Sequence, residues 1–293
     1  MNPIKIIFIV PTYNRLEILR KTIEINKTIC ARYDASIIII DNASQDDTYS
    51  HIKSSHPDIR IIKNDVNIGL KGSFKRALTE IANSETLLIF LSDEDIIFEP
   101  GLHELKKRLK QEKFSISENV LIFNHINRYG KDFWARRKVK EIKSWTDVEI
   151  LSFGLISGFG FFLSQNLIDK IDWSIVQDTR NTYPHWIYPF DRKNYIKTLG
   201  ITISATFEES NFTYLDEEWK SKKSHFSTSG VVDYLNYHKE LHNSFDAKIF
   251  RIRYAALGKI LNKESRIISK IFPAFIFAIS SPIQFFSYLI RFF

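Results

Sequence analysis

The chain has 293 residues, of which 44% are hydrophobic and 26% are charged, a balance that excludes an intrinsically disordered chain. At roughly 150 residues per domain, this length predicts about two structural units. Lys and Arg number 41 against 34 Asp and Glu, which gives a net charge of +7. The single cysteine, Cys30, excludes an intramolecular disulfide and a cysteine-based zinc site and fits a reducing compartment.

The N-terminal part of the chain alternates strand-like with helix-like segments. Short apolar runs predict buried strands at Ile6–Val10, Ile37–Ile40, Ile59–Ile62, Thr86–Leu91 and Val120–Phe123. Apolar residues at helical spacing predict helices between these strands, beginning near Leu16, Asp47, Phe74 and Leu102. Strands that alternate with helices favour right-handed crossovers, so we expect an α/β fold with a mainly parallel sheet flanked by helices.

The C-terminal end combines a basic segment with an apolar one. Residues Lys248–Lys270 hold seven basic residues and one acidic residue, and Ile271–Ile290 contains no charge. Such a pair of segments is drawn to anionic headgroups at the cytoplasmic membrane face. Because Pro273 and Pro282 interrupt the apolar part, we expect helices that lie in the interface rather than one that spans the bilayer.

Two other interpretations of this basic segment are a solvated amphipathic helix and a nucleic-acid-binding surface. Its basic residues are interleaved mainly with aliphatic residues and are followed by Phe-rich sequence. This pattern favours a membrane surface, so no nucleic-acid partner is expected.

Polar segments follow four of the predicted strands. They are Pro11–Arg15, Asp41–Ser44, Asn64–Gly72 and Ser92–Asp95. In an open parallel sheet, ligands bind beyond the carboxyl ends of the strands, so these segments predict one shared site. The sequence has no G-x-G-x-x-G or Walker motif, and neither a dinucleotide fingerprint nor a P-loop is supported.

The acidic triplet Asp93, Glu94 and Asp95 directly follows an apolar run. Carboxylate oxygens at the tip of a buried strand suit Mg²⁺ or Mn²⁺, which usually also hold substrate phosphates. The alternative is a helix N-terminus that is stabilised by acidic residues. Repulsion among adjacent carboxylates beside a buried strand is costly without a cation, and this favours a metal site.

Four motifs together resemble the family 2 glycosyltransferases of the GT-A type. They are Val-Pro-Thr-Tyr-Asn-Arg at 10–15, Asp-Asn-Ala-Ser at 41–44, Asn-Ile-Gly at 67–69 and Phe-Leu-Ser-Asp-Glu-Asp at 90–95. The resemblance covers residues 4–110 strongly and weakens towards residue 210. The Ser-Asp-Glu-Asp form is similar to the bacterial branch of abequosyltransferases and related surface-polysaccharide transferases.

The resemblance implies a GT-A domain at residues 1–210 and a separate region at 211–293. Within the GT-A domain, residues 1–110 would form the nucleotide-binding half and 111–210 the acceptor half. Residues 211–293 would be the helical, membrane-associating region.

The resemblance also implies a nucleotide pocket. The residues that would line it or lie along the ribose and phosphates are Pro11, Thr12, Asn14, Arg15, Asn67, Gly69 and Lys71. Asp41 would accept a hydrogen bond from the base, and Asn42 and Ser44 would shape that wall.

Asp93, Glu94 and Asp95 would form the D-x-D site, which contacts the ribose and holds Mn²⁺ or Mg²⁺ on the diphosphate. In the usual register the first Asp of the motif falls on Ser92 and a later one on Glu94. Which two carboxylates contact the metal is therefore open.

The catalytic base has several candidates. The family places an Asp of a Glu-Asp pair after a glycine-containing acceptor loop, for which we expect the segment 154–162, but no such pair follows. The polar candidates are Asp178, His185 and Asp191. His185 comes first because the ordinary pKa of histidine, near ~6.5, suits the role, and Asp191 second. The alternative for His185 is a hydrogen-bonded structural residue.

These features predict a metal-dependent inverting glycosyltransferase, peripheral on the cytoplasmic face of the cell membrane. Its substrates would be a nucleotide-sugar donor and a glycan or polyprenyl-linked acceptor. One alternative is an inactive, membrane-tethered protein that binds sugar nucleotides. The other is a nucleotidyltransferase on a similar sheet.

Overall fold

The computed structural model describes residues 4–81, 86–111, 120–126, 140–141, 159–162, 173 and 196–207. All of these residues belong to one compact unit of the chain. The base candidates Asp178, His185 and Asp191 and the predicted membrane region 211–293 lie outside the described residues. Among the described helices, none has both the length and the apolar content that a membrane crossing requires.

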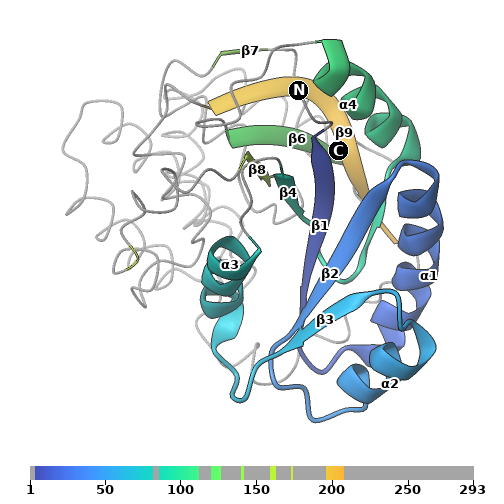
Figure 1. The fold of residues 1–293 in the computed structure, drawn as a ribbon, viewed down its shortest axis with the longest axis vertical. Helices are drawn as coiled ribbons and strands as arrows, with labels where there is room; N and C mark the ends of the chain where they lie inside the picture. Colours follow the sequence, from blue (N-terminus) through green and yellow to red (C-terminus); the bar gives the residue numbers. More distant parts are fainter. Residues whose placement is uncertain are drawn as a thin grey trace, which may run out of the picture. The chain divides into compact units, whose positions relative to one another are not determined.

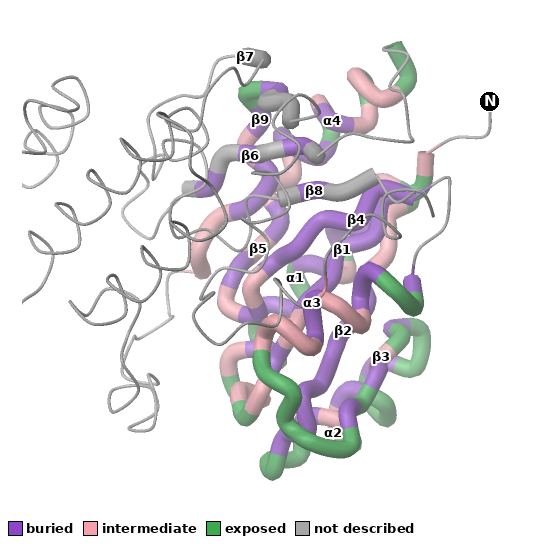
Figure 2. The backbone as a smooth tube through the Cα atoms, turned by 90° about the vertical axis from the view of Figure 1, so that its left-hand side faces the viewer, coloured by how far each residue is buried: buried purple, intermediate pink, exposed green. Residues whose placement is uncertain are grey.

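Four parallel strands form the N-terminal part of the sheet. Strand β1 (Lys5–Thr12) pairs with β2 (Ala35–Asp41) on one side and with β4 (Thr86–Phe90) on the other, and β3 (Arg60–Lys63) extends the sheet beyond β2. All four were predicted from their apolar runs. The strands β1, β2 and β4 are buried along most of their length, as Figure 2 shows, because both faces of the sheet are covered.

The sheet continues beyond β4 with mixed strand directions. Its order is β3-β2-β1-β4-β8-β6-β9-β5, with β7 paired to β9. The added strands are β5 (Asp95–Ile97), β6 (Val120–Ile126), β7 (Lys140–Glu141), β8 (Phe159–Phe162) and β9 (Ile196–Thr206). Strand β8 runs antiparallel to both neighbours, whereas β6 and β9 are parallel. The predicted α/β fold with a mainly parallel sheet is confirmed.

The structure corrects the C-terminal part of the predicted acceptor loop at residues 154–162, whereas residues 154–158 lie outside the described part of the chain. Residues Phe159–Phe162 are strand β8, inserted between β4 and β6. A Cβ atom on Gly160 would lie 2.7 Å from the ring of Phe123. Gly160 is therefore a glycine that makes room for a buried aromatic ring, and its lack of a side chain serves packing rather than contact with a sugar.

Within the described ranges, four helices cover the sheet. They are α1 (Leu16–Arg32), α2 (Thr48–Ser55), α3 (Gly69–Glu80) and α4 (Glu99–Gln111). Figure 1 shows α1, α2 and α4 on one face and α3 on the other. The chain moves outward from β1 to β3 and then returns past β1 to β4, so the crossover through α3 lies on the opposite face. The strand order reverses at β1 and β4, where open α/β sheets bind their ligands.

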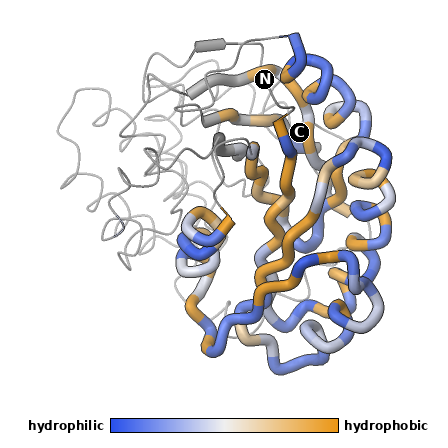
Figure 3. Tube along the Cα trace, in the orientation of Figure 1, coloured by the Kyte–Doolittle hydropathy of each residue, from blue (hydrophilic) through white to orange (hydrophobic). Residues whose placement is uncertain are grey.

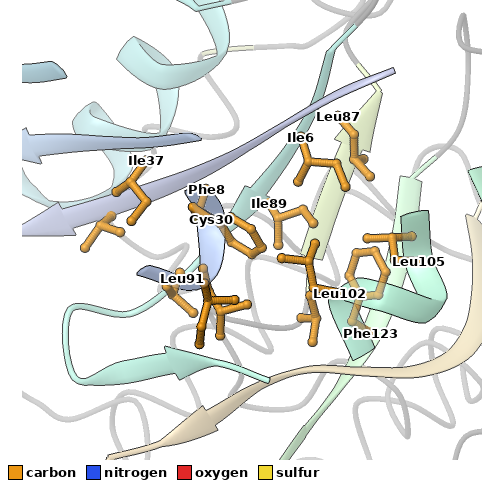
Figure 4. Packing of buried hydrophobic residues seen from close by; sticks show 14 of the residues in the cluster. Ile6, Phe8, Cys30, Ile37, Leu87, Ile89, Leu91, Leu102, Leu105 and Phe123 are labelled. Carbon is orange, nitrogen blue, oxygen red and sulfur yellow. The ribbon is translucent and has the colours of Figure 1, made fainter. Parts of the chain in front are cut away.

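The core lies between the sheet and helices α1 and α4. Figure 4 shows Phe8, Ile89, Leu102 and Phe123 packed there with Cys30 of α1. Burial raises the pKa of the Cys30 thiol to about 12, so this cysteine is a small apolar packing residue. Figure 3 shows the same division by hydropathy, with apolar strands and helices that carry polar residues.

Candidate active site

A turn of acidic residues follows β4 and is held by the segment that follows β1. Thr12 Oγ1 donates a hydrogen bond of 2.9 Å to Asp93 Oδ2, and Arg15 Nη1 donates one of 2.8 Å to Asp93 Oδ1. Arg15 Nη2 donates a bond of 2.6 Å to Glu94 Oε2. A single guanidinium thus joins two carboxylates at the point where the strand order reverses.

The buried position of Asp93 alters its acidity. Its residue is 4% exposed, and burial raises the pKa of its carboxyl to about 6. The charge of Arg15 and the hydroxyl of Thr12 act in the opposite direction and favour the carboxylate. Asp93 is therefore a carboxylate that depends on its two partners for its charged form.

Helix α1 supports the backbone of this acidic turn. Thr22 Oγ1 donates a hydrogen bond of 2.8 Å to the carbonyl oxygen of Asp93, and Asn26 Nδ2 donates one of 3.0 Å to that of Asp95. Asn26 Oδ1 accepts a bond of 2.7 Å from the backbone N–H of Ile97. The sequence analysis did not select Thr22 or Asn26. Their signal was a pair of polar residues inside the apolar stripe of an amphipathic helix.

His125 of β6 is a second residue that the sequence analysis missed. It is buried, and its two ring nitrogens lie 2.9 Å from Ser204 Oγ and 2.8 Å from Thr206 Oγ1. Its Nδ1 atom also lies 3.9 Å from Asp95 Oδ2. The alternation along β6 places Leu121, Phe123 and His125 on one buried face, so an inward-facing histidine was the signal.

The end of β2 forms a second wall of the site. Asp41 is fully buried, and its Oδ1 accepts a hydrogen bond of 3.0 Å from the backbone N–H of Ser44. Its Oδ2 is buried and has no hydrogen-bond partner within the part of the chain that the structure describes. Asn14 joins this wall to the first segment, because its N–H donates to Ser44 Oγ at 3.0 Å. Asn14 and Ala43 both have positive φ, at 52° and 64°, a strain typical of functional turns.

Amide side chains join the ends of β2 and β3. Asn42 Nδ2 donates a hydrogen bond of 2.6 Å to Asn67 Oδ1, and Asn64 Nδ2 donates one of 2.9 Å to Asn42 Oδ1. Gly69 begins α3 with a φ of 69°, where a side chain would be strained, and Lys71 lies in the first turn of that helix.

The structure thus brings the four polar segments together along one edge of the sheet. Thr12 lies opposite Asp41 in the strand register, and Asp41 lies opposite Lys63. Pro11 is half-buried and directly precedes Thr12 in β1. The predicted nucleotide and metal residues all belong to this edge, whereas the catalytic base candidates lie outside the described residues.

The acidic turn fits a divalent cation that arrives together with phosphate oxygens. Among the described residues, no group of three or more His, Cys, Asp or Glu side chains forms a ready metal cage. Asp93 and Asp95 are buried, whereas the side chain of Glu94 is 25% exposed. Mg²⁺ typically uses one or two carboxylates plus substrate phosphates, so the chemistry of this donor set suits such an ion.

Comparison with known proteins identifies the family. Residues 7–169, more than half of the chain, match the family described as glycosyl transferase family 2. The chain belongs to glycosyl transferase family 2. This glycosyltransferase has no match among curated protein sequences.

Two solved structures illustrate the similarity of fold. One is TarS 1–349 of S. aureus in complex with UDP-GlcNAc, with 14% identity, a TM-score of 0.56 and coverage of 96% of this chain and 82% of that one. The other is the mannosyltransferase PcManGT of Pyrobaculum calidifontis in complex with GDP-Man and Mn²⁺, with 11% identity, a TM-score of 0.53 and coverage of 97% and 82%. At these identities the likeness concerns the fold alone.

Proposed function

We propose that this family 2 glycosyltransferase is metal-dependent and inverting, and that it moves a sugar from a nucleotide-sugar donor to a lipid-linked or cell-surface polysaccharide. The observation that carries this proposal is the acidic turn, which Thr12 and Arg15 hold beside the wall formed by Asp41. The nucleotide sugars in the similar structures, UDP-GlcNAc and GDP-Man, support a donor of this class.

Asp41 is suited to bind the base of the donor. Its Oδ2 atom is a buried acceptor with no partner in the described part of the chain, and such an atom costs free energy until a donor reaches it. A ring N–H, such as that of uracil or guanine, would supply this donor. The side chains of Asn42 and Ser44 accept hydrogen bonds from Asn64 Nδ2 and from the N–H of Asn14, respectively, and so preserve the shape of this wall.

Glu94, with Asp93 and Asp95, would hold the divalent ion, either Mn²⁺ or Mg²⁺. When bound, such an ion neutralises the charge of the departing diphosphate as a Lewis acid. The residues of the chain prepare the site for it. Arg15 keeps Asp93 and Glu94 close together, and Thr12 orients the Asp93 carboxylate.

The acceptor hydroxyl would attack the anomeric carbon from the face opposite the leaving group, through an oxocarbenium-like transition state. Its proton would pass to a positioned base, for which we keep His185 first and Asp191 second. Inversion at the anomeric carbon follows from this single displacement.

The C-terminal tail would keep the enzyme at the cytoplasmic face of the membrane, where a polyprenyl-linked acceptor is available. The basic segment Lys248–Lys270 and the uncharged segment Ile271–Ile290 support this location. The Ser-Asp-Glu-Asp motif supports membership of the abequosyltransferase-like branch.

The proposal is tested with a panel of sugar nucleotides, each with and without Mn²⁺, by thermal shift and by donor hydrolysis. A bound donor raises the melting temperature by mass action. We expect at least one sugar nucleotide to do so, with a larger shift when Mn²⁺ is present. If no sugar nucleotide stabilises the protein under either condition, the proposed function is wrong.

The same assay separates the two alternatives. A nucleotidyltransferase would release pyrophosphate from a nucleoside triphosphate, and a binding protein without catalysis would be stabilised by the donor but would never hydrolyse it. Transfer or slow hydrolysis of the sugar nucleotide, with release of the nucleoside diphosphate, contradicts both.

Glu94 provides a sharper test of metal dependence. Glu94→Gln keeps the shape and the hydrogen bond from Arg15 but removes one charge from the acidic turn. We expect it to weaken Mn²⁺ binding about tenfold or more in the presence of the nucleotide, measured by calorimetry. Glu104→Gln is the matched control, since Glu104 is also partly exposed and pairs with an arginine, Arg108, on α4. Equal Mn²⁺ affinities in the two variants would contradict the metal assignment.

A further inference from the structure

A chain of hydrogen bonds leads from helix α3 to the end of β2, which forms the second wall of the site. Arg76 Nη1 donates to Asn64 Oδ1 and, at 2.9 Å, to the carbonyl oxygen of Lys63. Asn64 Nδ2 donates to Asn42 Oδ1 at 2.9 Å, and Asn42 Nδ2 donates to Asn67 Oδ1 at 2.6 Å. We name Arg76, Asn64, Asn42 and Asn67 the amide relay. It runs from a charged side chain on the helix to an exposed amide at the rim.

Chemistry fixes the direction of the amide relay. A guanidinium has donors only, so Asn64 must turn its carbonyl oxygen towards Arg76 and its NH₂ towards Asn42. The same logic turns the oxygen of Asn42 towards Asn64 and its NH₂ towards Asn67. Each bond polarises the next, so a charged donor at the start strengthens the series.

The amide relay also holds the backbone of the loop after β3. The N–H of Ile68 donates to Asn42 Oδ1 and the N–H of Gly69 donates to Asn67 Oδ1, both at 2.9 Å. The loop is otherwise open to solvent, since Val66 is 64% exposed and Ile68 is 42% exposed. Its conformation therefore depends on amide oxygens whose orientation begins with Arg76.

The side-chain amide of Asn67, the last in the amide relay, has a hydrogen-bond donor available for a ligand. Asn67 Oδ1 already accepts hydrogen bonds from Asn42 Nδ2 and from the N–H of Gly69. With both lone pairs of the oxygen in use, only its NH₂ group remains for a ligand. An exposed NH₂ suits an acceptor such as a phosphate, ribose or base carbonyl oxygen.

We propose that Arg76 is a positioning residue for donor binding, which acts through Asn64 and Asn42 to present the NH₂ of Asn67 to oxygens of the nucleotide. This inference rests on the proposed function, and it assigns a role to a side chain that contacts neither the acidic turn nor the Asp41 wall in any bond described above. Arg76 acts on affinity for the nucleotide and leaves the chemical step unchanged.

The chain offers a closely matched control. Arg76 Nε pairs with Glu80 of α3 at 2.7 Å, and Arg108 Nε pairs with Glu104 of α4 at 2.9 Å. The arginine side chains are 30% and 28% exposed, respectively. Removal of either guanidinium therefore breaks the same type of surface ion pair, but only Arg76 begins the amide relay.

The test compares Arg76→Met, Arg76→Lys and Arg108→Met by calorimetric titration with UDP and with GDP in the presence of Mn²⁺. We expect Arg76→Met to weaken nucleotide binding about tenfold, Arg76→Lys to restore most of the affinity, and Arg108→Met to match the wild type. The turnover number for donor hydrolysis stays within about twofold in all three, since the chemical step is intact.

A double-mutant cycle identifies the route. In the Asn67→Ala background, Arg76→Met has little further effect on affinity if Arg76 acts through Asn67. Additive effects of Arg76→Met and Asn67→Ala on affinity would overturn the inference. It would also be overturned if Arg76→Met, like Arg108→Met, bound the nucleotide as tightly as the wild type. If the wild type binds neither UDP nor GDP, the same comparison is made with the nucleoside diphosphate of the donor that the sugar-nucleotide panel selects, and only the absence of any such donor contradicts the proposed function itself. If Arg76→Met does not fold, Arg76→Gln, which also removes the charge, takes its place in the comparison and in the cycle.

Discussion

At the residue scale, Asp93 is the side chain that joins the acidic turn after β4 to the segment that follows β1. It accepts hydrogen bonds from Thr12 and Arg15 across 81 and 78 residues of sequence, and it is buried. Its raised pKa, about 6, means that burial outweighs the stabilisation that these two donors give to the charge. In this buried position, Thr12 and Arg15 keep the carboxyl largely charged at neutral pH.

Asp93 makes the stability of the protein depend on pH in a defined direction. Its carboxyl has a pKa of about 6 when folded, above the model value of 3.8, so between these values the folded state binds a proton that the unfolded chain has released. The free energy of unfolding should thus fall as the pH rises from about 4 through about 6.

The measurement is urea denaturation at several pH values in EDTA, without nucleotide. Asp93→Asn keeps an acceptor for Thr12 but cannot titrate, so the difference in unfolding free energy between wild type and variant should change across this pH range. A difference that is constant from pH 4 to pH 7 would contradict the role of Asp93.

Sequence reasoning found the polar residues that follow the strands but missed those that support them from beneath. Thr12, Asp41 and Asp93 stand within two residues of the end of an apolar run, so their position at the sheet edge could be predicted. Asn26 and His125 act through contacts across 69 to 81 residues of sequence, with Asp95, Ser204 and Thr206. No local pattern specifies such partners.

At the element scale, the strands that could be predicted are those with a continuous apolar run. Strands β1 to β4 are flanked on both faces and were found for that reason. Strands β5 and β8 have three and four residues, and β9 contains a bulge at Gly200, whose φ is 67°. Short or bulged strands carry little periodicity, and their pairing depends on distant partners.

Helix α4 owes its position to a glycine. A Cβ atom on Gly101 would lie 1.6 Å from the carbonyl oxygen of Thr202 in β9, so the helix can approach the sheet only without a side chain there. An exposed Gly→Ala change in a helix normally stabilises it by up to about 1 kcal/mol. Here the clash with backbone outweighs that gain.

We therefore predict that Gly101→Ala lowers the free energy of unfolding by about 2 kcal/mol or more, measured by urea denaturation. Lys107→Ala, on the exposed side of the same helix, is the control and should change stability little. Stabilisation by Gly101→Ala would show that α4 does not pack on β9 as described.

At the scale of the whole molecule, the location of the site on the sheet is determined by the order of the strands rather than by individual side chains. The strand order reverses between β1 and β4, which are neighbours in the sheet. The four polar segments meet at the sheet edge beside this point. This arrangement was predictable from alternating strands and helices. The mixed part of the sheet beyond β4 was not, because its strands pair across long stretches of sequence, such as the 111 residues between Asp95 of β5 and Thr206 of β9.

The membrane prediction also belongs to this scale. Deletion of all residues after Asn262 removes the uncharged segment and part of the basic one. We expect this truncation to move the protein from the membrane fraction to the soluble fraction, as measured by sedimentation of cell extracts and binding to anionic vesicles. Donor hydrolysis by the truncated protein is the control for folding. Unchanged partitioning would contradict a tail anchor.

Cys30, the only cysteine of the chain, packs in the core with a pKa of about 12, where its thiolate does not form at neutral pH. Thiol-directed dyes will therefore not label Cys30 in the native state. A second cysteine introduced at the exposed position Val66, next to Asn67, would be the one that a maleimide fluorophore labels. The wild-type chain is thus already a suitable background for watching nucleotide arrival in real time, with no need to remove its native cysteine first.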